Sequence, residues 1–213
     1  MNIPFAISAR TAHLIGLENF ANSEGAIVEL VKNAYDADAD ICIVVADIQQ
    51  TKSNSKLYII DNGVGMTSDT IINHWMTIGT DDKLINTHSS KKRRVKSGAK
   101  GIGRFALNRL GKHAEMLTFT NNDSNTGYKW NVDWTKFDKA RILSDIMIEA
   151  ILWVLLNTLQ NNQLNKLPIY EKFVSKPFHG TILCISDLND DWNEDNLNAL
   201  LKNLEMLIPA HMQ

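Results

Sequence analysis

The sequence predicts an α+β fold in which helices cover one face of a mostly antiparallel sheet. Apolar residues recur at helical spacing near both ends of the chain, over residues 25–37 and 193–207. Between them lie short runs rich in β-branched residues, which do not alternate with helices in the regular βαβ order of a parallel sheet. The 213 residues are 44% apolar, enough for one hydrophobic core, so we expect a single domain over residues 1–213.

Local patterns place the elements of the first half of the chain. Ser23 is the expected N-cap of the helix over 25–37, because its hydroxyl can accept a hydrogen bond from the first turn. The other elements expected here are a helical or mixed segment at 11–20, strands at 41–46 and 56–60 around a polar turn at 49–55, a short helix at 69–78 and a long polar loop at 79–97.

The second half is expected to complete the sheet and add further helices. The apolar run at 146–156 favours a buried helix, so residues 139–165 as a whole are expected to be helical. The other elements expected here are a helix opened by residues 98–103 and ending at Gly111, a hairpin of 114–120 with 127–132, a strand at 180–186 and a helix at 193–207.

The bulk composition limits the class of protein. The net charge of −2 gives no overall reason to expect a nucleic acid or an anionic membrane as partner. The N-terminus lacks the pattern of a signal peptide, and the run at 146–156 is too short to cross a bilayer. Cys42 and Cys184 sit in apolar runs without zinc or disulfide spacing, and we expect buried thiols in a reducing cytoplasm.

One face of the helix at 25–37 carries groups suited to a nucleotide and a metal ion. At about 100° per residue, Glu29, Asn33 and Asp36 lie within about 60° of one another. An amide oxygen suits magnesium, which keeps water and phosphate oxygens as its other ligands. A glutamate one turn away can orient or deprotonate an attacking water. Taken alone, a polar stripe of this kind is more simply a solvated helix face.

Two glycine-containing motifs lie at the ends of expected elements. Residues 61–66 read Asp-Asn-Gly-Val-Gly-Met directly after a strand, which alone would indicate a tight turn. Residues 98–105 read Gly-Ala-Lys-Gly-Ile-Gly-Arg-Phe and open a helix, where backbone N–H groups can bind an anion. Their spacing matches neither the dinucleotide fingerprint nor the Walker A loop.

In this order, segments 29–38, 61–66 and 98–105 resemble the N, G1 and G2 boxes of the GHKL ATPases. That superfamily includes gyrase B-type topoisomerases, the ninety-kilodalton heat-shock chaperone, sensor histidine kinases, MutL and the MORC proteins. The resemblance covers roughly residues 8–208 and favours the MORC and heat-shock-like branch. It implies the Bergerat fold, a two-layer α+β sandwich, with ATP and Mg²⁺ as ligands.

The resemblance also implies roles for the first two motifs. Glu29 matches the general base and Asn33 the magnesium ligand, whereas Asp36 matches a residue near the ribose or its water shell. Asp61 matches the carboxylate that accepts a hydrogen bond from the adenine amino group. The other residues implied to lie on the adenine side are Ala37, Gly63, Gly65, Met66 and, through water, Thr181.

The third motif and the loop before it are implied to surround the phosphates. Lys100 would either contact a phosphate or face solvent, and Thr80 lies where related proteins begin their lid. The basic run at 91–96 has three interpretations: an exposed lid, closure over the triphosphate, or contact with a nucleic acid. The implied phosphate-binding residues are Gly98, Ala99, Lys100, Gly101, Ile102, Gly103 and Arg104.

The function implied by the resemblance is an ATP-binding switch domain that hydrolyses ATP slowly and depends on Mg²⁺. Lid closure and homodimerisation would follow ATP binding, and the chain would be the N-terminal part of a longer protein. One alternative is a histidine-kinase-like catalytic domain, although Glu29 at the base position argues against it. Another is a nucleotide-binding interaction module without turnover. The expected location is the cytoplasm, without a membrane partner.

Overall fold

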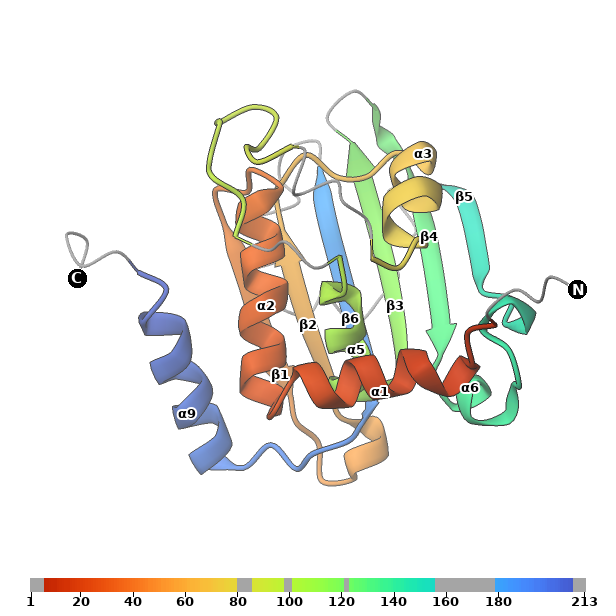
Figure 1. The fold of residues 1–213 in the computed structure, drawn as a ribbon. Coiled ribbons are helices and arrows are strands. Elements are labelled where there is room, and N and C mark those ends of the chain that lie inside the picture. The colour runs from red at the N-terminus through yellow and green to blue at the C-terminus, as the bar shows by residue number, and fades with distance from the viewer. Residues whose placement is uncertain (1–5, 80–85, 98–100, 121–122, 156–178, 209–213) are drawn as a thin grey trace, which may run out of the picture.

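The computed structural model describes residues 6–79, 86–97, 101–120, 123–155 and 179–208. Its centre is one six-stranded sheet in the order β1-β2-β6-β3-β4-β5, and every neighbouring pair is antiparallel (Figure 1). The predicted α+β class is therefore confirmed. The strands are β1 (Cys42–Asp47), β2 (Lys56–Asp61), β3 (Gly111–Thr120), β4 (Asp123–Asp133), β5 (Glu149–Leu155) and β6 (Gly180–Leu188).

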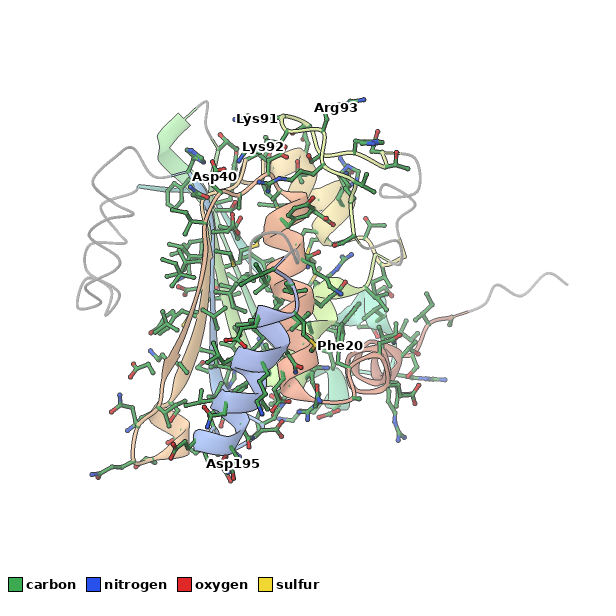
Figure 2. All side chains as sticks on the ribbon, turned by 90° about the vertical axis from the view of Figure 1, so that its left-hand side faces the viewer. Phe20, Asp40, Lys91, Lys92, Arg93 and Asp195 are labelled. Carbon is green, nitrogen blue, oxygen red and sulfur yellow. The ribbon has the colours of Figure 1, made fainter. Side chains whose placement is uncertain are left out.

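The described helices lie on one side of this sheet, as the side view in Figure 2 shows. None of them is long and apolar enough to cross a membrane. They are α1 (Ala9–Asn19), α2 (Ser23–Asp36), α3 (Ser68–Thr70), α5 (Ala106–Leu110), α6 (Thr135–Lys139) and α9 (Glu194–Glu205). Shorter turns are η1 (Lys52–Asn54), the π-helix η2 (Ile71–Trp75), η3 (Gly103–Phe105) and η4 (Leu143–Asp145).

The hydrophobic core forms between α2 and the sheet. Ile27 and Leu30 of α2 are buried in one cluster with Leu57 and Ile59 of β2. Because side chains alternate across a strand, the residue two positions beyond Ile59 points toward the same side. That residue is Asp61, so the packing of β2 against the helices also turns this carboxylate toward them.

The N-terminus of α2 lies one residue earlier than the sequence suggests. Asn22 is the N-cap, with its side-chain oxygen accepting a hydrogen bond from the backbone N–H of Gly25 at 2.8 Å. Ser23 instead donates its hydroxyl proton to Asp190 Oδ2 at 2.5 Å. The predicted cap at Ser23 is therefore wrong, because a distant carboxylate engages its hydroxyl while Asn22 holds the extended backbone that a cap requires.

The predicted helix over 139–165 is also wrong in its described part. Residues 143–145 form a single turn, and β5 then pairs with β4, with Glu149 opposite Asn131 and Leu155 opposite Thr126. A short apolar run can form either a buried helix or a strand, and the β-branched and aromatic residues of 151–154 favour the strand. Residues 156–165 of the predicted helix lie outside the described residues.

The two cysteines are free thiols, and each residue is partly exposed rather than fully buried. Burial of the sulfur raises the pKa of Cys42 to about 12, and the charge of Asp61 adds to this effect. Burial likewise raises the pKa of Cys184 to about 11. Both thiols therefore stay protonated near neutral pH, which makes them poor nucleophiles.

Candidate functional site

A cavity of about 440 Å³ lies between α2, the helix-facing side of β2 and β6, and the glycine-rich segment before η3. A larger hollow of about 580 Å³ involves Tyr58 and Cys184 of the sheet, but among the described residues no glycine and no residue of α2 lines it. The smaller cavity holds most of the predicted site. Of the predicted residues, Glu29, Asn33, Ala37, Asp61, Gly65, Met66, Gly101, Ile102, Gly103, Arg104 and Thr181 line it.

The face of α2 that borders the cavity presents Glu29, Asn33 and Ala37, one turn apart from each other. Asp36 is not among the lining residues. Its Oδ1 atom accepts hydrogen bonds from the backbone N–H of Ser97 at 2.8 Å and from the Ser97 hydroxyl at 3.2 Å. In this structure Asp36 therefore holds the loop beside the cavity, and its predicted contact with the ribose stays a prediction.

Asp61 ends β2 and lines the cavity, with only 8% of its surface exposed. Its Oδ1 atom accepts a hydrogen bond from the backbone N–H of Gly63 at 2.8 Å. Burial raises the pKa of Asp61 to about 6, although hydrogen bonds from the backbone of Gly63 and Thr181 oppose the shift. The site thus keeps a poorly solvated carboxylate that gains from a hydrogen-bond donor on a ligand.

The turn after Asp61 accepts no side chain at two of its positions. A Cβ atom on Gly63 would lie 2.6 Å from the carbonyl oxygen of Ala37, and one on Gly65 would lie 2.0 Å from that of Phe119. Gly65 also has a φ of +69°. The absence of side chains at these two positions lets the turn pack directly against the end of α2 and against β3, while Gly65 also lines the cavity.

The glycine-rich segment meets α2 across the cavity. A Cβ atom on Gly103 would lie 3.0 Å from Nδ2 of Asn33, so the side chain of Asn33 lies directly against the backbone of Gly103. Gly101 has a φ of +63°, a conformation that glycine adopts without strain. The predicted site residues Thr80, Gly98, Ala99 and Lys100 lie outside the described residues.

A comparison of the sequence with known protein families is consistent with this geometry. A family model described as histidine kinase-, DNA gyrase B- and HSP90-like ATPase matches residues 21–164. The chain belongs to the GHKL ATPases. The matched range contains Glu29, Asn33 and Asp61 together with the glycine-rich segment, so an ATP-binding domain of the ATPase type is the function this membership supports.

In this GHKL domain the guanidinium of Arg104 is held by backbone carbonyl oxygens of the protein. Its guanidinium donates to the carbonyl oxygens of Trp75, Thr77 (2.7 Å) and Gly101 (2.8 Å). Burial lowers the pKa of Arg104 to about 10, which still leaves it charged at neutral pH. Arg104 therefore ties the glycine-rich segment to the wall formed by 75–77, and a role in phosphate binding stays a prediction.

The sequence did not reveal a buried threonine that supports the G1 turn of the GHKL site. The Thr118 hydroxyl accepts from the backbone N–H of Met66 at 2.9 Å and lies 3.2 Å from the Gly180 carbonyl oxygen, to which it donates. Because that hydroxyl has one proton, Thr181 is the donor in the 3.1 Å contact between the two threonines. The hydroxyl oxygen of Thr181, which also lines the cavity, can then accept a hydrogen bond from water or a ligand.

Replacing Thr118 by valine keeps the side-chain shape and removes these bonds. We expect Thr118→Val to lower the free energy of unfolding by about 1–3 kcal/mol, because the Met66 N–H and the Thr181 hydroxyl lose a buried partner. Urea denaturation would measure the change. Thr51→Val, at an exposed threonine that makes no capping bond, is the control and should stay within about 0.5 kcal/mol. A loss of that small size in Thr118→Val would remove Thr118 from the support of the turn.

Other lining residues also escaped the sequence analysis, among them Phe20, Thr70, His74 and Trp75. The last two belong to the π-helix η2, a form of helix that is frequent at functional sites. No local spacing marks these residues, because the segment reaches the cavity only through the fold. His179 likewise supports the site from a distance, with its Nδ1 atom 2.7 Å from the carbonyl oxygen of Gly63.

Proposed function

We propose that this domain binds ATP in the 440 Å³ cavity and hydrolyses it slowly with the help of Mg²⁺. The observation that carries the proposal is the meeting of Glu29 and Asn33 from α2 with Asp61 from β2 in that cavity. Asp61 would accept a hydrogen bond from the amino group of adenine, where guanine presents an oxygen instead. The backbone of Gly101–Arg104 would face the phosphates.

The residues present fit a magnesium ion that is shared with the nucleotide. Among the described residues, no group of three or more His, Cys, Asp and Glu side chains could hold a metal by itself. The amide oxygen of Asn33 is a hard donor, and phosphate oxygens and water commonly complete the shell of Mg²⁺. A bound Mg²⁺ would neutralise part of the phosphate charge, while Glu29, one turn earlier, would orient and deprotonate the attacking water.

The proposed function is tested by measuring phosphate release and binding together. Calorimetry should show tighter binding of ATP and ADP than of GTP, and steady-state phosphate release should require both ATP and Mg²⁺. Equal affinity for GTP would contradict the role of Asp61. Tight ATP binding without any phosphate release would favour an interaction module without turnover, whereas transfer to a protein histidine would favour a kinase-like domain.

The role of Asn33 leads to a separate prediction about magnesium. We expect Asn33→Ala to lower the affinity for ATP with Mg²⁺ at least about tenfold, the effect seen even for residues that only support metal ligands. Affinity for ATP in EDTA should change little, because the amide then has no ion to bind. The ratio of the two dissociation constants by calorimetry is the measurement. An unchanged ratio in the variant would assign the ion to other ligands.

Finer features of the function belong to the same proposal. We propose that ATP binding closes the loop after η2 and promotes homodimerisation, and that the chain works in the cytoplasm as part of a longer protein of the MORC and heat-shock-like branch. The position of Ser97 at the cavity supports the loop closure, because Ser97 connects that loop to the proposed nucleotide site. Sedimentation with and without a non-hydrolysable ATP analogue tests the dimer, and a monomer in both conditions would contradict it.

A further inference from the structure

The basic segment next to the cavity, residues 87–96, forms a hydrogen-bonded hairpin. The Ser89 backbone N–H donates to the Arg94 carbonyl oxygen at 2.8 Å, and the Arg94 N–H donates to the Ser89 hydroxyl at 2.8 Å. The Lys96 N–H donates to the Thr87 carbonyl oxygen at 2.8 Å. We call residues 87–96 the basic hairpin. Figure 1 shows it in yellow-green over the end of α2 from which the chain enters β1.

The tip of the basic hairpin surrounds one carboxylate. The backbone N–H of Lys91 donates to Asp38 Oδ2 at 2.7 Å, and that of Lys92 donates to Asp38 Oδ1 at 3.2 Å. Asp38 is buried, with 5% of its surface exposed. Burial alone would raise the pKa of Asp38, but hydrogen bonds from Ser89, Lys91 and Lys92, with the charge of Arg94, lower it. Successive N–H groups around an anion form a stable arrangement that backbone turns commonly build.

Asp38 holds this position in an unusual backbone conformation. Its φ is +63°, in the left-handed region that glycine occupies without steric cost and that aspartate occupies less readily. The backbone alone would therefore favour glycine here. The presence of a carboxylate at such a position, engaged on both oxygens, indicates that the side chain contributes more than the turn requires.

The contacts on either side of Asp38 extend this connection to the cavity. Arg94 donates to the carbonyl oxygen of Ala39 at 2.7 Å, and its guanidinium lies 4.6 Å from the ring centre of Tyr35. Asp36 binds Ser97, which lines the cavity and directly precedes the glycine-rich motif in the sequence. Figure 2 shows the exposed side chains at the hairpin tip together with Asp40, at the end of the molecule opposite Asp195.

We propose that Asp38 is a positioning residue that holds the basic hairpin on the end of α2 and thereby fixes Ser97 at the edge of the nucleotide site. This inference rests on the proposed function, because it assigns the hairpin to the phosphate side of the bound ATP. Asp38 itself does not line the cavity. Its loss should therefore weaken the binding of phosphates and leave the binding of the nucleoside unchanged.

The first measurement tests, without any ligand, whether Asp38 holds the hairpin in place. Asp38→Gly removes the carboxylate and suits the positive φ, so the turn itself is kept. Trypsin cleaves after lysine and arginine, and Lys91, Lys92 and Arg93 are exposed at the tip. We expect the initial rate of cleavage within the hairpin to be about tenfold higher in Asp38→Gly than in the wild type, because cleavage follows local opening. Mass spectrometry of the released peptides would measure this rate.

The second measurement separates positioning from general damage. Calorimetry would compare ATP with adenosine, which lacks phosphates. If the hairpin of Asp38→Gly is docked on α2 in only a tenth to a fifth of the molecules, and only these molecules bind the phosphates, the dissociation constant for ATP rises about five- to tenfold. The constant for adenosine should stay within about twofold of the wild type, because the residues on the adenine side are untouched. Asp38→Asn, which tolerates the same φ and keeps one acceptor, should give smaller changes in the same direction.

Two controls match the two features of Asp38. Asp40→Ala removes an exposed aspartate that also contacts the hairpin, through the ammonium of Lys92, and should behave as the wild type. Asp187→Gly relieves another aspartate with positive φ, 51°, far from the hairpin in the sequence, and should leave cleavage in the hairpin unchanged. The first control shows whether loss of a surface charge alone affects the hairpin. The second shows whether relief of a positive φ alone has an effect elsewhere in the protein.

Each outcome decides the inference. Faster hairpin cleavage with a selective loss of ATP affinity supports it. Unchanged cleavage in both Asp38→Gly and Asp38→Asn overturns it, and so does an equal loss of ATP and adenosine affinity. If the wild type binds both ligands, such a failure concerns Asp38 alone. If the wild type binds neither, the proposed nucleotide function itself is overturned, and the role of Asp38 with it.

Discussion

Replacing Asp61 by asparagine is expected to abolish most ATP affinity while making the ligand-free protein more stable. A hydrogen bond that involves a charged group contributes about 1.5–3 kcal/mol, so the dissociation constant for ATP should rise about 10- to 150-fold. Asparagine can still accept from the backbone N–H of Gly63, which keeps the turn. Calorimetric titration with ATP, at a pH above 7, measures this loss.

The gain in stability follows from the pKa of the buried carboxyl. The pKa of Asp61 is raised to about 6 in the folded protein, so the folded state binds a proton more readily than the unfolded state between about pH 4 and 6. The contribution of Asp61 to stability is therefore greatest at low pH and falls as the pH rises through this window. The rise of this pKa from about 4 to about 6 lowers the free energy of unfolding by roughly 3 kcal/mol at neutral pH, and the neutral asparagine does not carry this cost.

Thermal unfolding without nucleotide tests this second half of the prediction. Asp61→Asn should melt at a higher temperature than the wild type at pH 7.5, and the difference should shrink toward pH 4. Asp69→Asn, on the exposed surface of α3, is the control and should change neither stability nor affinity. A lower melting temperature for Asp61→Asn at pH 7.5 would contradict the prediction, because it would mean that the carboxylate stabilises the empty site.

Most elements of the fold could be predicted because their patterns are local. The helical spacing around Ile27 and Leu30 and the β-rich run before Asp61 are complete within a few residues. The strand β5 was not predicted, because an apolar run of its length suits a buried helix equally well until its partner is known. That partner, β4, pairs through register positions such as Lys129 with Ile151, which no local period encodes.

The candidate site divides in the same way. Glu29, Asn33 and Asp61 could be recognised because each lies in a motif whose residues are neighbours in the sequence. Thr118 and Arg104 act through atoms that the fold brings together, the Met66 N–H for the first and the Trp75 carbonyl for the second. Such supports follow only from the three-dimensional arrangement, although they decide whether the recognised residues are correctly placed.

Removal of the Glu29 carboxylate is expected to separate hydrolysis from binding. Glu29 lines the cavity one turn before Asn33, and its ion pair with Lys32 is long, at 3.8 Å, and partly exposed. Loss of a general base typically costs about 10²–10⁴-fold in rate. We expect Glu29→Gln, which keeps the side-chain shape, to lower phosphate release by this factor and to keep the affinity for ATP within about twofold.

Single-turnover phosphate release with excess protein is the appropriate measurement, because it detects slow hydrolysis and does not depend on product release. Glu24→Gln, in the first turn of α2 and outside the cavity lining, is the matched control and should hydrolyse ATP as the wild type does. Undiminished hydrolysis in Glu29→Gln would assign the base to another group. A parallel loss of affinity and rate would instead mean that Glu29 contributes to ground-state binding, since a residue acting only on the attacking water lowers the rate alone.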